Sequence, residues 1–344
     1  MSDLLTIISN ESIYKDNDTY YCDNIESKSV PEGLSKSYEI VNIGRRSKIC
    51  RSFKINIKST YAASNIFSFL YSIFRTFSIK NSNYLLISIS PYTFFASLLL
   101  IIFRKKFIVY LRSSGYEEYK KIIGTVGPFI YHFMFSIVSH KAKLIACGSH
   151  LFERKTGIVV TPSQLNDRWF ANHVKPDLTQ AKLLYIGRIK IEKGVFSLLN
   201  IFKDLNKNIN LTIVGTGTID HKHLQKQSNI HMISCVNKED SIIKIYDSHN
   251  IFILPSFTEG YSQVIDESLS RCRPVIIFKE ISNVVNNNRQ GVFICERDSN
   301  SLSIMIKHIL DNYKSIEKKI MLNKYPTKDK FIKSLINIVK ENKS

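Results

Sequence analysis

Short, nearly uninterrupted apolar runs alternate with longer amphipathic stretches along the whole chain. Such runs, rich in β-branched residues and bounded by turn residues, are typical of parallel strands covered on both faces, and the stretches between them fit crossover helices. Six runs fall in the first half, at 4–9, 38–43, 84–90, 107–112, 142–149 and 157–163. Six more follow, at 181–188, 210–217, 229–236, 249–256, 273–280 and 291–296. Two such sets predict two doubly wound α/β domains.

A polar stretch at 170–180, which contains Pro176, separates the two sets of strands and is predicted to link the domains. We therefore expect an N-terminal domain over 1–172 and a C-terminal domain over 173–325. The last segment, 326–344, is predicted to be a terminal helix with a lysine-rich outer face. Its apolar residues recur at helical spacing, as Phe331, Leu335, Ile336 and Val339.

One apolar segment is long enough to be tested as a membrane span. Residues 84–103 include no charge over 20 positions, but serines, a threonine and a proline interrupt them. Because proline suits the first turn of a helix, Pro91 predicts a strand that turns into a buried helix beginning near Tyr92. The uncharged stretch 122–138 is a weaker candidate, since it contains glycines, a proline and a histidine.

The composition excludes several classes of protein. The chain has 344 residues, 44% of them apolar, and a formal net charge of +19, from 48 Lys and Arg against 29 Asp and Glu. This excludes a disordered or collagen-like protein and favours anionic partners. No zinc-finger, RNP-type or basic heptad motif supports nucleic-acid binding.

The N-terminus does not resemble a secretory signal. The scattered cysteines indicate a reducing cytosol: Cys22, Cys50, Cys147, Cys235, Cys272 and Cys295.

Residues 45–80 mix Arg and Lys with aromatic and aliphatic residues. Such a segment suits the surface of an anionic bilayer. Within it, an apolar stripe at helical spacing is interpreted first as the core face of a crossover helix, and only second as a lipid-inserting face. The stripe consists of Phe67, Leu70, Tyr71 and Phe74.

Two strand-end loops in the second half carry candidate phosphate-binding groups. In the first, Gly187 and Arg188 end a strand, and Lys193 and Gly194 open a helix. Two cations beside a helix N-terminus suit a pyrophosphate, although solvated side chains are the common alternative. In the second loop, glycines beginning with Gly215 allow close approach of the backbone to a ligand.

A third loop, PSFTEGYSQVIDES, begins at a strand end and runs into a helix that starts near Ser262. Glu259 lies in the loop, and Glu267 lies one to two turns down the helix. The amides of residues 261–263 are suited to an anion. A carboxylate beside a phosphate site is suited to hydrogen-bond sugar or ribose hydroxyls. Without the other motifs, the two glutamates would be interpreted as a charge near a helix N-terminus and a solvated side chain.

Taken together, these motifs resemble the donor domain of the family 4 retaining glycosyltransferases over residues 181–300. The order is Gly-Arg, Glu-Lys-Gly, Val-Gly-Thr-Gly, then Leu-Pro-Ser, Glu-Gly-Tyr-Ser and Glu, followed by Arg-Pro-Val-Ile. The resemblance implies a GT-B fold, with two Rossmann-like domains facing a cleft and the terminal helix crossing back to the N-terminal domain. It implies no cofactor and no metal, with a UDP- or GDP-linked sugar as co-substrate, because Arg188 and Lys193 would neutralise the leaving diphosphate.

The resemblance also implies residue roles. Arg188 and Lys193 would stabilise charge on the departing phosphate, Glu259 would contact the donor sugar, and these three form the expected catalytic set. The expected donor-binding set is Gly187, Gly215, Thr216, Gly260, Tyr261, Ser262, Gln263 and Glu267.

The sequence departs from the family pattern at three places. The family's usual histidine in the first domain has no clear counterpart, and the strand end LRSSGYEEY at 111–119 occupies the corresponding region. Cys272 stands where the family usually has a glycine. The family's glycine-rich loop after the first strand is replaced by SNESIYKDNDTYYCDN at 9–24, which is either an acceptor-lining loop or simply an exposed one. Candidates for the acceptor side are Glu11, Arg112, Ser113 and Glu117.

The resemblance therefore implies a retaining transferase that moves a sugar from a nucleotide-sugar donor to a glycan or polyprenyl-pyrophosphate-linked saccharide. The resemblance places it in bacterial surface polysaccharide synthesis, as for O-antigen, capsule or exopolysaccharide. We expect a cytoplasmic protein at the inner face of the plasma membrane, in contact with anionic lipid and not with nucleic acid. Two alternatives stay open: a non-catalytic polyanion- or membrane-binding protein on the same scaffold, and a nucleotide-sugar epimerase.

Overall fold

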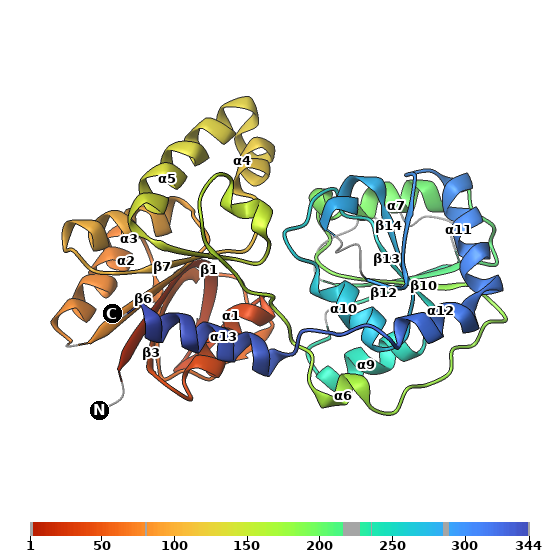
Figure 1. Cartoon of the computed structure of the whole chain (residues 1–344), viewed down its shortest axis with the longest axis horizontal. Coiled ribbons are helices and arrows are strands. Elements are labelled where there is room, and N and C mark those ends of the chain that lie inside the picture. Colours follow the sequence, from red (N-terminus) through yellow and green to blue (C-terminus); the bar gives the residue numbers. More distant parts are fainter. Residues whose placement is uncertain (1–2, 80, 216–227, 235, 285–288, 343–344) are drawn as a thin grey trace. The chain divides into compact units, whose positions relative to one another are not determined.

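The computed structural model describes residues 3–79, 81–215, 228–234, 236–284 and 289–342 (Figure 1). The chain forms two compact units. The first comprises Met1–Gln164 together with Thr327–Ser344, and the second comprises Leu165–Pro326. Each unit has its own largely parallel sheet, so the predicted class of two doubly wound α/β domains is confirmed.

The sheet of the first unit has its parallel strands in the order β5-β3-β1-β6-β7-β8-β9. All six predicted strands of this half are present, and the central residues of five are buried, whereas both residues of β9 are exposed. The bounds are β1 Leu4–Asp16, β3 Glu39–Ser47, β5 Ser59–Ala63, β6 Ser82–Ile87, β7 Ile108–Leu111, β8 Lys143–Ala146 and β9 Ile158–Val159.

The segment that follows the first predicted strand is a β-hairpin. Strand β1 continues to Asp16 and turns back into β2 (Thr19–Cys22), which pairs with it in antiparallel register. Strand β4 (Phe53–Ile55) then adds to β2. The predicted loop at 9–24 is therefore wrong for most of its length. Polar residues flank Ile13 and Tyr14 in this segment. Pairing with a neighbouring strand satisfies more backbone hydrogen-bonding groups than a loop would.

Helices cover both sides of this sheet, with α1 packed against α13 and with α2, α3 and α5 in successive contact. As predicted, Pro91 begins α3, and Ser90 caps it in a reciprocal arrangement with Thr93. The terminal helix packs on the first unit, where the Tyr38 hydroxyl donates to the carbonyl of Ile336 at 3.4 Å. The bounds are α1 Ile25–Leu34, α2 Ile66–Phe74, α3 Pro91–Ile102, α4 Gly115–Ile123, α5 Gly127–Lys141 and α13 Lys328–Glu341.

Helix α2 buries a different face from the one expected. Phe69 and Ile73 are fully buried, and Phe69 lies edge-on to Tyr92 of α3, with ring centroids 5.2 Å apart. The predicted core stripe is wrong for three of its members, because their side chains point to solvent: Phe67 is 81% exposed, Tyr71 63% and Phe74 47%. Apolar residues surround most of this helix, so spacing alone did not reveal which side meets the sheet.

The second unit has the strand order β12-β11-β10-β13-β14-β15, the doubly wound order in which the first strand lies at the centre. Its strands are parallel and almost wholly apolar. Their bounds are β10 Lys182–Ile186, β11 Asn210–Val214, β12 Ile230–Ile233, β13 Ile251–Leu254, β14 Val275–Phe278 and β15 Val292–Cys295. The helices are α6 Asp167–Phe170, α7 Val195–Phe202, α9 Glu239–Asp247, α10 Gln263–Ser270, α11 Ser299–Asp311 and α12 Tyr313–Ile320.

The division between the units falls after Gln164, eight residues before the expected boundary. Leu165 and Trp169 pack into the core of the second unit, so this part of the chain already belongs to it. Two fully buried arginines hold the predicted linker there. Arg271 donates to the carbonyls of Trp169, Ala171 and Asn172, and Arg273 donates to that of Val174. Asp247 balances part of their charge, with Oδ2 2.8 Å from Arg271.

Between these arginines, Cys272 has a φ of 57°, in the left-handed region where glycine is favoured. The backbone therefore keeps the conformation that explains why the family pattern has glycine there, although this chain carries a buried cysteine.

Candidate functional site

The strand order of the second unit predicts where a ligand binds. In open parallel sheets, ligands bind outside the carboxyl ends of the strands, where the order reverses. Here that point lies between β10 and β13, which pair through Leu183 and Leu184. The loop after β10 holds Arg188 and Lys193, and the loop after β13 holds Glu259. The topology thus brings the two sequence motifs to one edge of one sheet.

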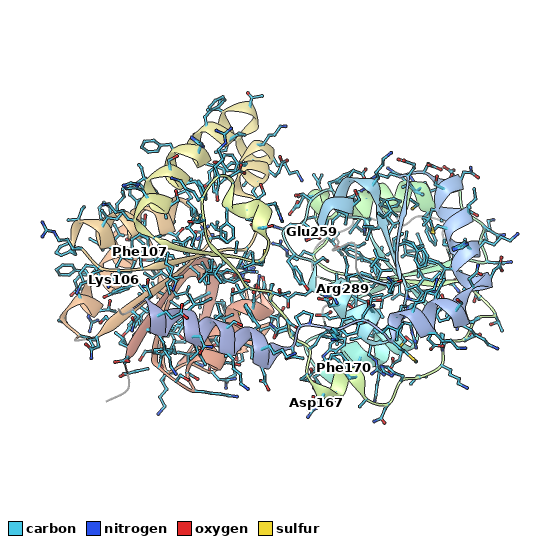
Figure 2. The ribbon with its side chains drawn as sticks, in the orientation of Figure 1. Lys106, Phe107, Asp167, Phe170, Glu259 and Arg289 are labelled. Carbon is cyan, nitrogen blue, oxygen red and sulfur yellow. The ribbon has the colours of Figure 1, made fainter. Side chains whose placement is uncertain are left out.

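Lys193 and Glu259 form an ion pair at this edge. The Lys193 Nζ lies 2.7 Å from Glu259 Oε1, and the Ser256 hydroxyl donates to the same oxygen at 2.6 Å. The two charged side chains are only 20% and 10% exposed, so the pair is more strongly coupled than a surface pair. Figure 2 labels Glu259, which lies in the loop between β13 and α10. The pair is a partly buried cation and carboxylate, both within reach of one small ligand.

The two loops are packed so closely that glycine is needed between them. Gly194 has a φ of 67°, and a Cβ placed there would lie 1.8 Å from the carbonyl oxygen of Pro255. The amide of Phe257 donates to the carbonyl of Glu192 at 3.0 Å, which ties the loops together. This contact fixes the short 3₁₀ turn Ile191–Lys193 and so helps to direct Lys193 toward Glu259.

Arg297, which the sequence reasoning missed, holds the loop after β13 from its other side. Its guanidinium donates to the carbonyls of Pro255 and Ser256 at 2.9 and 3.2 Å and pairs with Glu280. It also lies over the ring of Phe257, 4.1 Å from the centroid. Arg297 is a positioning residue for Glu259. Its position two residues after β15, at the same sheet edge as the other loops, was the available signal.

Other predicted donor-side residues lie around the pair without joining it. The side chain of Arg188 is exposed, and its carbonyl accepts a hydrogen bond from the Tyr185 hydroxyl at 2.8 Å. Gly187 and Gly215 extend the strand pairing, since their amides donate to the carbonyls of Val214 and Ile233. Thr216 lies outside the described residues.

Glu267 is a half-buried residue of α10. The buried Tyr246 hydroxyl donates to Glu267 Oε2 at 3.0 Å. Loss of hydration raises the pKa of Glu267 to about 7, although the tyrosine hydrogen bond opposes the rise. Burial and the adjacent carboxylate also raise the pKa of Tyr246, which keeps it a donor. Glu267 can therefore change its charge near neutral pH.

The start of α10 offers further polar groups. No side chain among the described residues caps this helix, whose N-cap is Ser262. Gln263 Oε1 is buried and lacks a hydrogen-bond partner within the described part of the chain. Tyr261 is held differently, because its hydroxyl donates to Asp266, which also pairs with Arg289 at 2.8 Å. The amides and Gln263 are therefore free to receive a ligand, and Tyr261 is engaged by the protein.

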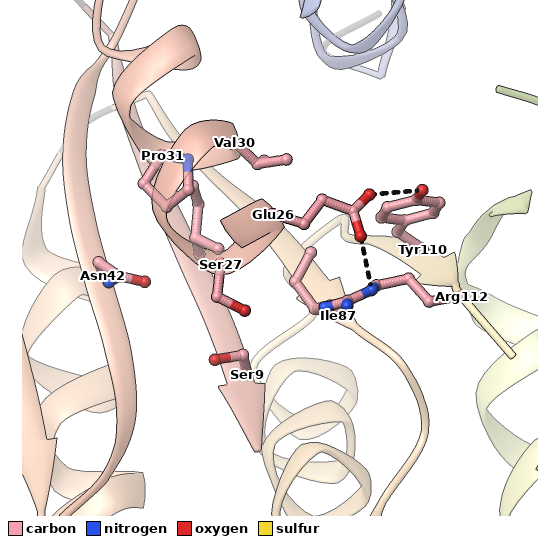
Figure 3. Close-up of a pocket in the computed structure, with 10 residues that line it drawn as sticks. Ser9, Glu26, Ser27, Val30, Pro31, Asn42, Ile87, Tyr110 and Arg112 are labelled. Atoms are coloured by element: carbon pink, nitrogen blue, oxygen red, sulfur yellow. Dashed lines mark hydrogen bonds and ion pairs between the residues drawn. The ribbon is translucent and has the colours of Figure 1, made fainter. Parts of the chain in front are cut away.

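The first unit has its own polar pocket at the corresponding point of its sheet, between β1 and β6. Figure 3 shows the Glu26 carboxylate at its centre. Glu26 accepts from the Tyr110 hydroxyl at 3.0 Å and pairs with Arg112 Nε at 2.9 Å. Serine, asparagine and aliphatic side chains complete the lining: Ser9, Ser27, Asn42, Ile7, Val30, Pro31 and Ile87. The sequence reasoning named Arg112 but missed Glu26, which lies in the first turn of an unremarkable helix.

The four acceptor-side candidates are only partly brought together. Glu11 accepts from the Ser27 hydroxyl at 3.1 Å and so lies beside the pocket that Arg112 lines. Glu117 is exposed in the first turn of α4. Ser113 follows Arg112 in the chain and does not line the pocket.

Known proteins match the segment of this chain that holds the site, and others share its fold. Residues 180–312 match the family model "Glycosyl transferases group 1". An uncharacterized glycosyltransferase of Haemophilus influenzae is 29% identical over 38% of this chain and 38% of its own length. The capsular polysaccharide biosynthesis glycosyltransferase CapM of Staphylococcus aureus is 26% identical over 37% of this chain and 36% of its own length. The chain thus aligns with less than two fifths of either relative.

A solved structure extends the likeness to the fold of both units. Anabaena Alr3699/HepE, in complex with UDP, superposes with a TM-score of 0.70 at 9% identity, over 99% of this chain and 100% of that one. The fold is therefore GT-B, with two Rossmann-like α/β units. The group 1 motifs and the family match coincide in the second unit, so this part of the chain matches the group 1, or family 4, glycosyltransferases.

Proposed function

We propose that this protein transfers a sugar from a nucleotide-sugar donor bound by the second unit to a saccharide acceptor. One observation carries the proposal: the partly buried Lys193–Glu259 pair lies at the point where the strand order of the sheet reverses. A phosphate and a sugar hydroxyl need a cation and a carboxylate at neighbouring positions, and this pair supplies both.

In this proposal, Lys193 and Arg188 stabilise negative charge on the departing diphosphate. Such groups accelerate a reaction most when they are fixed in advance and partly shielded from water. Lys193 meets this condition, since its side chain is 20% exposed and is oriented by Glu259. Arg188, whose side chain is exposed, has to swing toward the phosphates on binding. Glu259 keeps one carboxylate oxygen on Lys193 and Ser256 and offers the other to hydroxyls of the donor sugar.

The start of α10 would receive the nucleotide. The uncapped amides after Ser262 suit a phosphate, and the unpartnered Gln263 side chain suits a polar group of the donor. Glu267, on the same helix, would accept hydrogen bonds from the ribose in its ionised form. UDP in the complex of the HepE structure supports a UDP- or GDP-linked donor.

The acceptor would bind at the first unit, in the pocket lined by Arg112 and Glu26. Paired charges with serine and asparagine neighbours offer both donors and acceptors to sugar hydroxyls, without the net charge that a phosphate requires. The family resemblance adds retention of anomeric configuration. The printed role of CapM supports a place in surface polysaccharide synthesis.

The test combines donor binding with product analysis. A panel of nucleotide sugars is screened by thermal shift, since a ligand that binds only the folded protein raises its stability. The stabilising donor is then incubated with saccharide acceptors, and the products are analysed. Transfer or slow hydrolysis is expected, and Glu259→Ala and Arg188→Ala should abolish most of either. Wild-type turnover by both variants would refute the site. Conversion of the donor to its epimer would favour the epimerase, and no saturation by any donor would favour a non-catalytic polyanion-binding protein.

A further inference from the structure

We infer that helices α2, α3, α4 and α5 of the first unit form a docking face for an anionic lipid bilayer. We call this the apolar face. It is defined by large apolar side chains that are at least 46% exposed: Phe67, Tyr71, Phe74, Phe95, Ile102, Phe103, Ile122, Ile123, Val126, Phe129 and Phe133. This inference goes beyond the proposed transfer reaction and does not depend on it.

The α4–α5 hairpin is the most apolar part of this face. By length and composition, Gly115–Lys141 could cross a membrane as one helix. Only 28% of its most apolar window is buried, whereas a core helix would be mostly buried. The structure divides it into helices of 9 and 15 residues that pack against each other and project together from the unit (Figure 1). At about 1.5 Å per residue, even the longer helix falls short of a bilayer core of about 30 Å. The hairpin can therefore enter a bilayer surface but cannot span it.

The turn of the hairpin depends on Gly124, whose φ is 75°. It follows Ile122 and Ile123, and Phe129 comes soon after, so apolar side chains lie on both sides of the turn. Helix α5 buries Tyr131, Met134, Phe135 and Val138 against the unit while its opposite face carries Phe129 and Phe133. A helix that is apolar on both faces requires two apolar partners. Within this unit, α3 and α4 pack against α5, but its face with Phe129 and Phe133 stays 76% and 61% exposed.

Charge identifies the second partner. Between residues 40 and 152 the chain carries 16 Lys and Arg but only two acidic residues, which leaves 32 basic and 27 acidic residues elsewhere. The cations border the apolar side chains: Arg75 follows α2, 104–106 follows α3, Lys120 and Lys121 end α4, and Lys141 ends α5. Apolar side chains bordered by lysine and arginine match the layered chemistry of a membrane, hydrocarbon beneath anionic headgroups.

A nucleic acid or a second copy of the chain fits less well. Nucleic-acid sites place cations at the centre of the contact, whereas here phenylalanine and isoleucine occupy the centre and cations the margin. A symmetric dimer through this face would bring two strongly positive regions together, which costs free energy.

The experiment measures partition of the full chain between buffer and sedimented vesicles of phosphatidylcholine, with and without phosphatidylglycerol. Wild type should bind the anionic vesicles and bind the neutral ones weakly. I122S/F129S, which alters two side chains that are both 76% exposed, should lower the partition coefficient about tenfold or more. K120A/K121A should lower it about fivefold per lysine, and only on anionic vesicles.

Matched controls come from the second unit. I304S/L322S removes side chains that are 61% and 79% exposed, and K318A/K319A removes an adjacent exposed pair at the end of α12. Both should bind vesicles like wild type. All variants should keep donor binding in solution, which separates this inference from the proposed reaction. Vesicle binding that I122S/F129S leaves unchanged would overturn the inference. So would self-association that the same substitutions abolish, or salt-sensitive binding to RNA in place of vesicles.

Discussion

The two units use the same arrangement of strands around their first strand, yet they present very different polar groups at the equivalent edge. In the second unit, β10 ends in a glycine-bounded turn, the Lys193–Glu259 pair lies in the strand-end loops, and the described side chains leave the start of α10 uncapped. In the first unit, β1 continues into a hairpin, and Glu26 is satisfied by Arg112 and Tyr110 inside a pocket. A parallel sheet determines where polar groups gather, and the loops determine whether they remain available to a ligand.

The largest expected effect tests the second unit. Lys193→Ala should lower kcat for transfer about 10²–10³-fold, because it removes a fixed cation from the site of developing charge. Lys190→Ala is the matched control. Lys190 lies in the same loop with a side chain that is 52% exposed and 3.9 Å from Glu192, so little change is expected. Steady-state kinetics measures both, and equal losses in the two variants would remove Lys193 from the mechanism.

The next effect tests the first unit. Arg112→Ala leaves the Glu26 carboxylate, whose side chain is 6% exposed, with Tyr110 alone. Removal of one partner from a buried pair should destabilise the fold by about 3 kcal/mol. Lys143→Ala breaks a pair with the 65% exposed Glu341 and should cost less than about 1 kcal/mol. Urea unfolding measures both. A loss as small in Arg112→Ala as in Lys143→Ala would show that the pocket pair is not structural.

The smallest expected effect is a pH dependence of stability and of donor affinity that arises from Glu267 in α10. Because burial raises the pKa of Glu267 to about 7, the folded protein binds its proton more tightly than the unfolded chain does. This group therefore favours folding at low pH, and its contribution is lost as the pH rises from the ordinary glutamate range through about 7. Donor affinity should change in the opposite sense, because the ionised carboxylate accepts ribose hydrogen bonds. Glu267→Gln should flatten the pH profiles of stability and of donor affinity between about pH 5 and pH 8, the range over which this carboxylate titrates. Thermal unfolding and donor titrations across that range measure them, and a Glu267→Gln profile that parallels wild type would assign the dependence to other groups.

Much of the fold was predictable because buried parallel strands have short, apolar sequences. All twelve predicted strands exist, and Pro91 marked the start of α3 correctly. The missed strands, β2, β4 and β5, are short and partly polar, and they form by adding to edges that other strands have already made. The donor-side motifs were visible because a strand-end loop carries its chemistry in consecutive residues.

Contacts between distant segments could not be read in the same way. Glu26 and Arg112 are far apart in the chain, and neither is unusual until α1 packs beside β7. Arg297 resembles any surface arginine until its guanidinium meets the carbonyls of Pro255 and Ser256. On α2, apolar residues occur on several faces, so the burial of Phe69 and the exposure of Phe67 follow from which side meets the sheet and α3. Local patterns encode backbone conformation and average burial. The pairing of charges and the choice of buried face depend on neighbours that only the folded chain supplies.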